Sequence, residues 1–195
     1  MGLNEFAGYF ALAGAALATG YVAAGYGLRP EPFYLGVVFV SVGLGLSAFV
    51  VRETRHHADA ESKLHGELPP EGMPSQREVF WRTTLVDRNL SSVSQAGLVN
   101  NLNDGMAWGL FPLVFAAAGM NLEQIGTLAA VYPATWGLAQ ILTGAWSDRV
   151  GRKWLIASGM WVQAGAIAAI AVAPGFAMFA AAAALLGLGT AMVYP

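Results

Sequence analysis

Long uncharged apolar runs alternate with polar connections along most of the chain. The uncharged runs occupy residues 6–28, 32–51, 105–122, 124–147 and 154–195. A helix needs about 20 apolar residues to cross roughly 30 Å of hydrocarbon, so each run is long enough for a span. The last run is long enough for two, with a turn expected at Pro174 and Gly175. The pattern therefore predicts an all-α transmembrane protein with six visible membrane-spanning helices.

The placement of the charges predicts the orientation of these helices. Most charged residues lie in two segments, 52–88 and 148–153. Lys and Arg are retained on the cytoplasmic side of a membrane protein. We expect segments 53–94 and 147–153 to be cytoplasmic. With Arg52, at the edge of the first segment, counted on the same side, every Lys and Arg except Arg29 is then cytoplasmic. We therefore expect a multi-pass protein of the inner (plasma) membrane with both chain ends inside.

Composition agrees with a lipid environment and limits the chemistry. Hydrophobic residues make up 56% of the 195 residues and charged residues only 11%, with a mean hydropathy of +0.52. The chain has no cysteine, which excludes disulfides and Cys-based metal sites. It also has no P-loop and no nucleophile elbow, so we expect neither ATP hydrolysis nor another enzymatic activity. We expect no cofactor and no nucleic-acid partner.

The hydrophilic stretch in the middle of the chain reads as two parts. Residues 61–75 contain Pro69, Pro70 and Gly72, which are typical of a flexible linker. Residues 76–93 have apolar positions near helical spacing, with Trp81 able to anchor at the headgroups, and predict an amphipathic helix on the inner membrane surface. A solvated irregular loop is the alternative. A metal site from the residues His56, His57, Asp59, Glu61 and His65 is disfavoured in such a loop, and we expect no bound metal.

Small residues at four-residue spacing in the first span, such as Ala16, Gly20 and Ala24, predict close packing of two helix backbones. A general richness in Ala and Gly is the alternative explanation.

The third span carries a concentration of polar side chains. It is expected to begin near Gln95, which places Asp104 roughly 14 Å into the bilayer. Carboxylates at that depth usually face a cavity and mark a substrate, ion or proton pathway. The candidate substrate-binding or ion-coupling residues are Asn100, Asn101, Asn103, Asp104, Trp108 and Gln140. Asp104 would carry a proton or pair with a cationic substrate.

A structural polar cluster that holds helices together is the alternative for the same residues. Helix–helix hydrogen bonding is the favoured role for Gln140 and Gln163 individually. Pro112 removes a backbone hydrogen bond and is able to kink this span. Glu5 is expected to be a solvated residue at the membrane interface.

A short polar motif, GAWSDRVGRK at residues 144–153, connects the fourth and fifth spans. Gly144 is expected to allow close helix contact, and Gly151 to supply a permissive turn conformation. Asp148 is able to form an ion pair that is made in one conformation and broken in another. The motif residues to which we assign this conformational-latch role are Gly144, Asp148, Arg149, Gly151, Arg152 and Lys153.

This motif closely resembles the cytoplasmic signature of the major facilitator superfamily, Gly-x-x-x-Asp-Arg/Lys-x-Gly-Arg-Arg/Lys, at every defining position. The resemblance implies a bundle of twelve helices in two halves, of which this chain would supply helices five to ten. Residues 1–52 would then be the last two helices of the N-terminal half, 53–94 the cytoplasmic inter-half loop, and 95–195 the first four helices of the C-terminal half. Four helices would precede the chain and two would follow it.

The resemblance further implies a secondary active transporter that works by alternating access and is coupled to an ion or proton gradient. Its partners would be a small-molecule substrate, the lipid bilayer, protons and the remaining helices of the same transporter. A membrane scaffold or receptor without transport activity, or a membrane-embedded enzyme that uses Asp104, is the alternative.

Overall fold

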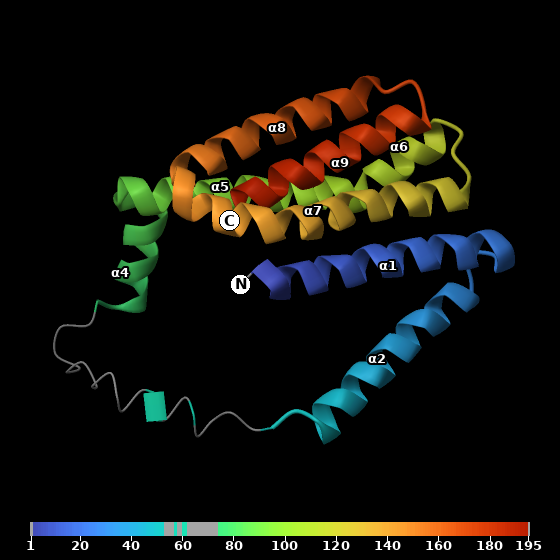
Figure 1. The fold of residues 1–195 in the computed structure, drawn as a ribbon, viewed down its shortest axis with the longest axis horizontal. Helices are drawn as coiled ribbons and strands as arrows, with labels where there is room; N and C mark the ends of the chain where they lie inside the picture. Colours follow the sequence, from blue (N-terminus) through green and yellow to red (C-terminus); the bar gives the residue numbers. More distant parts are fainter. Residues whose placement is uncertain (1, 53–56, 58–59, 62–73, 195) are drawn as a thin grey trace. The chain divides into compact units, whose positions relative to one another are not determined.

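The computed structural model describes residues 2–52, 57, 60–61 and 74–194. These residues are helical apart from their connections and contain no β-strand, which confirms the all-α prediction. The helices (Figure 1) are α1 (Gly2–Tyr26), α2 (Glu31–Phe49), α4 (Gln76–Trp81), the π-helical turn η1 (Arg82–Val86), α5 (Arg88–Gly109), α6 (Phe111–Ala117), α7 (Leu122–Val150), α8 (Arg152–Val172) and α9 (Phe176–Val193).

Five of the helices, namely α1, α2, α7, α8 and α9, are long and apolar enough to cross a membrane. The region expected to form the third span is divided at Leu110 into α5 and α6. Pro112 lies at the start of α6 and has no N–H to donate, and the next amide, that of Leu113, donates instead to the carbonyl of Leu110. The helix is therefore interrupted where Pro112 was expected to kink it. The arrangement of six spans in two halves stays a prediction.

The helix that contains the expected third span begins before that span. The helix begins at Arg88, seven residues before Gln95, because the Asp87 carboxylate accepts hydrogen bonds from the N–H groups of Asn89 and Leu90 and so caps it. The single amphipathic helix predicted over 76–93 is likewise interrupted at Asp87, whose backbone is extended. Most of the expected linker at 61–75 lies outside the described residues.

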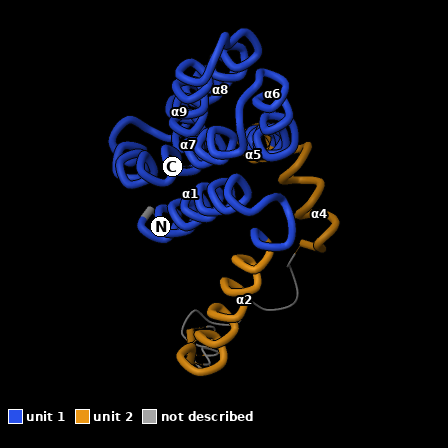
Figure 2. The backbone as a smooth tube through the Cα atoms, turned by 90° about the vertical axis from the view of Figure 1, so that its right-hand side faces the viewer, with its two compact units in different colours: residues 1–32, 95–195 blue, residues 33–94 orange. Residues whose placement is uncertain are grey.

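The chain divides into two compact units, residues 1–32 with 95–195 and residues 33–94 (Figure 2). In the first unit α1 packs along α7, and α9 packs against both α7 and α8. A Cβ atom built on Gly20 would lie only 2.6 Å from the Cα of Gly126. The close approach predicted from the small-residue spacing of the first span is therefore confirmed at Gly20, opposite a second glycine on α7.

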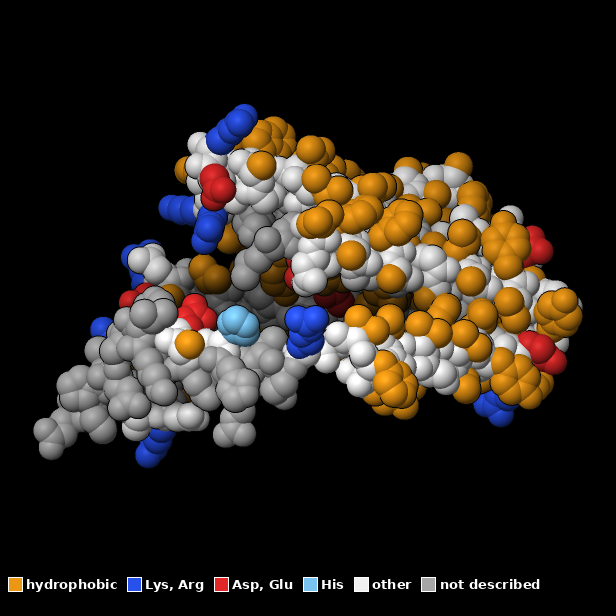
Figure 3. All heavy atoms as spheres, turned by 60° about the horizontal axis from the view of Figure 1, so that its bottom comes forward, with side chains coloured by type: hydrophobic (Ala, Val, Ile, Leu, Met, Phe, Trp, Pro, Cys, Tyr) orange, Lys and Arg blue, Asp and Glu red, His pale blue; other side chains and the backbone are white. Residues whose placement is uncertain are grey.

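Aromatic and small side chains fill the interior of this first unit. Phe115 of α6, Leu128 of α7 and Phe179 and Leu186 of α9 are all almost fully buried. The visible outer faces of the helices carry many hydrophobic side chains (Figure 3). Apolar side chains that face outward as well as inward are what a bilayer environment favours.

The polar connections of the first unit lie at its two ends (Figure 1). The turn at Gly151 lies at the end where α1 and α5 begin and α9 ends, and the turns after α1, α6 and α8 lie at the other. Arg29 therefore lies at the opposite end from the basic residues of the 144–153 motif. The turn expected at Pro174 and Gly175 is confirmed, because α8 ends at Val172 and α9 begins at Phe176.

Candidate functional site

A buried polar network joins four helices in the middle of the first unit. Gln163 of α8 is 1% exposed and donates to the Oδ1 atom of Asn100 of α5 at 2.6 Å and to the Oγ1 atom of Thr190 of α9 at 3.2 Å. Its own Oε1 atom accepts from the Nδ2 atom of Asn103 at 2.6 Å. Since a buried amide without partners is costly, these bonds explain how Gln163 and Asn100 are accommodated in an apolar interior.

Asp104 is connected to this network through a tyrosine. The hydroxyl of Tyr132 donates to the Oδ1 atom of Asp104 and lies 3.3 Å from the Oγ1 atom of Thr190. The Nδ2 atom of Asn100 lies 3.5 Å from the other carboxylate oxygen, one turn away on α5, as the shared helix face predicted. We define the polar network as the six residues Asn100, Asn103, Asp104, Tyr132, Gln163 and Thr190.

Asp104 also borders a cavity in the first unit with a volume of about 780 Å³. Helices α1, α5 and α7, the first residue of α8 and Tyr194 after α9 provide its walls. Its polar and aromatic lining residues are Glu5, Tyr9, Asn101, Asp104, Trp136, Gln140, Ser147, Asp148, Arg152 and Tyr194. The cavity therefore brings together side chains expected to bind substrate and side chains of the 144–153 motif.

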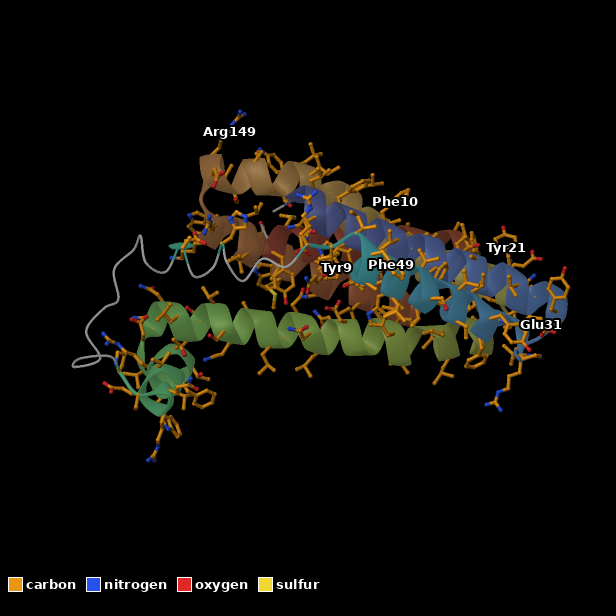
Figure 4. The ribbon with its side chains drawn as sticks, turned by 90° about the horizontal axis from the view of Figure 1, so that it is seen from below. Tyr9, Phe10, Tyr21, Glu31, Phe49 and Arg149 are labelled. Carbon is orange, nitrogen blue, oxygen red and sulfur yellow. The ribbon has the colours of Figure 1, made fainter. Side chains whose placement is uncertain are left out.

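Three aromatic rings stack along one wall of the cavity, and we call them the aromatic stack. The Trp136 ring lies between those of Tyr9 and Tyr194, with centroid distances of 3.6 Å and 6.0 Å. Tyr9 is on the inner side of α1, whereas its neighbour Phe10 points outward (Figure 4). Gln140 supports the stack, because its Oε1 atom accepts from the Trp136 indole and its Nε2 atom donates to the Tyr194 carbonyl.

The structure places the sequence-predicted candidates in different surroundings. Asn101 and Gln140 line the cavity, and the Nδ2 atom of Asn101 donates to the hydroxyl of Tyr194 at 3.3 Å. Asn100 and Asn103 point instead into the polar network. Trp108 packs near Tyr132 beside a separate small space and does not line the cavity.

The 144–153 motif forms the connection between α7 and α8. Gly151 alone separates the two helices and has a φ of +90°, a conformation that side chains rarely adopt, which confirms its expected role. Within the described residues no helix contacts Gly144. A Cβ atom built there would have no described atom outside its own helical turn within 4 Å, because this face of α7 borders the cavity. The close helix contact expected there stays a prediction.

The charged residues of this motif are exposed. The Oδ1 atom of Asp148 lies 4.0 Å from the Nη2 atom of Arg152, with about three quarters of each side chain accessible. Arg149 points away from the end of α7 (Figure 4), and the ammonium of Lys153 lies 5.6 Å from the ring centroid of Trp154. The cation close to Asp148 is thus Arg152. Both residues line the same cavity as Asp104.

Sequence reasoning missed several residues of this region. Tyr9, Tyr194 and Thr190 gave no signal beyond being polar or aromatic positions in apolar runs. Glu5 was expected to be solvated at the interface, whereas it lines the cavity. A polar side chain in an otherwise apolar span was the only available signal. It identified Gln163, Asn100 and Asn103, but neither Thr190 nor the hydrogen bonds that join these residues.

Metal binding finds no support in the part of the chain that the structure describes, which has no group of three or more residues able to hold an ion. His56, Asp59 and His65 of the disfavoured metal cluster lie outside the described residues.

Comparison with known proteins identifies relatives of the second half of the chain. Residues 93–195 match the family model described as Major Facilitator Superfamily. The chain is 26% identical over 106 residues to the "Fosmidomycin resistance protein" of Escherichia coli (strain K12), a match that covers 54% of this chain and 26% of that protein. The match thus spans about a quarter of the length of this curated relative. No solved structure matches the chain.

Proposed function

Since the chain belongs to the Major Facilitator Superfamily, we propose that it acts as part of a secondary active transporter that moves a small solute across the inner (plasma) membrane by alternating access. The family match and the five apolar helices show a multi-pass membrane protein of a transporter family. Coupling to an ion or proton gradient, the two-half architecture and the contribution of further helices belong to the proposal.

The observation that carries this proposal is the cavity of about 780 Å³. It borders Asp104 and Asn101 from α5 and Gln140 from α7, and it also reaches Asp148 and Arg152 at the helix connection. Alternating access requires that solute binding shifts the equilibrium between two conformations. A solute site and a conformational latch that border the same cavity are suited to this coupling.

Within this mechanism Asp104 binds the coupling proton or a charged group of the solute. A carboxylate in a membrane-spanning region is costly and is expected to face a polar pathway, as Asp104 does here. Asp148 and Arg152 pair in one conformation and separate in the other. We also propose that the 53–94 and 147–153 segments lie in the cytoplasm, which the basic residues near Gly151 support.

The test is solute-driven proton movement in inside-out membrane vesicles that carry the product of the full reading frame encoding this chain. A pH-sensitive dye reports proton release while a panel of cationic, neutral and anionic solutes is added. We expect at least one solute to release protons, and Asp104→Asn to abolish the release although the protein remains inserted.

Glu123→Gln is the matched control, because Glu123 is an exposed carboxylate in the first turn of α7 and does not line the cavity. It should leave proton release unchanged. Normal release in the Asp104→Asn variant would remove Asp104 from the mechanism. Absence of movement with every solute class would instead favour a scaffold or receptor.

A further inference from the structure

The charge of the cavity wall is unbalanced towards acid. Three carboxylates line it, those of Glu5, Asp104 and Asp148, against one cation, Arg152. Arg152 is closest to Asp148, so that pair is neutral as a unit. Among the described residues, no cationic side chain forms a salt bridge with Glu5 or Asp104.

Glu5 and Asp104 line the same cavity as the three rings of the aromatic stack. Both carboxylates are close enough to Tyr9 to interact with it electrostatically. They come from different helices, α1 and α5, and meet only because the helices pack around the cavity. Two carboxylates of separate origin that face one space attract a positive charge far more strongly there than in water.

The aromatic stack provides the second recognition element. Trp136 is 4% exposed and is held by its hydrogen bond to Gln140, so its position is fixed. The rings of tyrosine and tryptophan attract cations and also offer flat apolar surface to a ligand. A wall of this kind beside two carboxylates suits a ligand with a positive charge and an apolar body.

The charges that line the cavity argue against an anionic solute. An anionic solute would face Glu5 and Asp104 and would find only Arg152, which lies near Asp148.

We propose that this cavity binds small hydrophobic organic cations, with Glu5 and Asp104 neutralising the positive charge and the aromatic stack contacting the apolar body. The inference rests on the proposed transport function for its physiological meaning, but binding itself is measurable separately. A volume of about 780 Å³ is of the size of pockets that take drug-sized molecules.

The experiment compares two probes of the same shape and opposite charge, tetraphenylphosphonium and tetraphenylborate. The product of the full reading frame that encodes this chain is placed in nanodiscs of uncharged phosphatidylcholine. Binding of radiolabelled probe is measured by equilibrium dialysis as the excess over protein-free nanodiscs. We expect saturable binding of the cation and at least about tenfold weaker binding of the anion.

The variants assign the binding to this cavity. Glu5→Gln and Asp104→Asn should each weaken cation binding about tenfold, and Trp136→Leu by about threefold or more. Glu123→Gln and Trp161→Leu are matched controls outside the cavity and should have no effect, since Trp161 is 80% exposed on α8. Because Asp104→Asn also alters a hydrogen bond to Tyr132, the Glu5→Gln variant keeps the test valid if the former misfolds.

Equal binding of the two probes, or cation binding that neither Glu5→Gln nor Trp136→Leu reduces, would overturn the inference. Its failure is distinguishable from that of the proposed function. Proton release driven only by anionic or neutral solutes would support the proposed transport function and contradict the proposed cation site. Cation binding that these variants weaken, without transport of any solute, would support the cation site and contradict the proposed transport function.

Discussion

Replacing Gly20 with alanine should separate α1 from α7. The added Cβ would lie 2.6 Å from the Cα of Gly126 and 3.2 Å from the carbonyl oxygen of Leu122. Both are backbone atoms, so no flexible side chain is able to move aside. Because non-bonded carbon atoms prefer about 3.5–4.0 Å, the helices must move apart by about 1 Å at this point. Overpacking of this kind typically costs about 1–3 kcal/mol.

Gly14 on the same helix provides the matched control. A Cβ built on Gly14 meets no described atom outside its own helical turn within 4 Å. Both substitutions gain the same intrinsic advantage of alanine over glycine in a helix, about 1 kcal/mol, so this contribution cancels in the comparison. The expected difference between the two variants is therefore the full overpacking cost, with Gly20→Ala the less stable.

The assay is chemical unfolding in mixed detergent micelles, followed by tryptophan fluorescence. Gly20→Ala should have a free energy of unfolding lower than that of Gly14→Ala by about 1–3 kcal/mol. Equal stability of the two variants would refute the reasoning, because it would mean that α1 and α7 do not approach each other closely at Gly20.

The other predictions concern the helix connection and the polar network. Gly151→Ala should destabilise the chain by about 1–3 kcal/mol in the same unfolding assay, because alanine is strained at a φ of +90°, whereas Gly165→Ala in open space on α8 should not. Gln163→Leu should cost about 2 kcal/mol, at about 0.6 kcal/mol for each of its three interhelical hydrogen bonds, and Ser158→Ala on the same helix should cost less. Asp148→Asn should slow solute-driven proton release by no more than about fivefold, since an exposed pair is worth at most about 1 kcal/mol; an unchanged rate would remove Asp148 from the latch.

The helices and their connections were predictable because they depend on local features. Length, apolarity and the positions of Gly151 and Pro174 are enough to place α7, α8 and α9 to within a few residues. The start of α5 was not predicted, because hydropathy marks where a helix could enter lipid and not where it begins. The capping side chain of Asp87 extends that helix into a polar segment.

The candidate site was only partly predictable, for a different reason. Asp104 and its neighbouring asparagines were visible in the sequence as polar residues in a span. Which of them faces the cavity and which faces Gln163 depends on how α5 is rotated against α8 and α9, and no local pattern specifies that rotation. The position of Glu5 at the cavity was equally unpredictable from a local pattern, because it depends on the packing of α1 on α7.

Asp104 is the point at which the polar network and the cavity meet. Its carboxylate accepts the hydroxyl of Tyr132, which in turn lies beside Thr190 on α9, and the same side chain borders the cavity. A cation or a proton that neutralises Asp104 weakens it as a hydrogen-bond acceptor, so the bond from α7 weakens at the same time. By thermodynamic reciprocity, a conformation that breaks this bond must change the affinity of Asp104 for the cation or proton. Binding in the cavity and the packing of α5, α7 and α9 are thereby linked through one carboxylate, and the network would have this role in addition to holding the helices together.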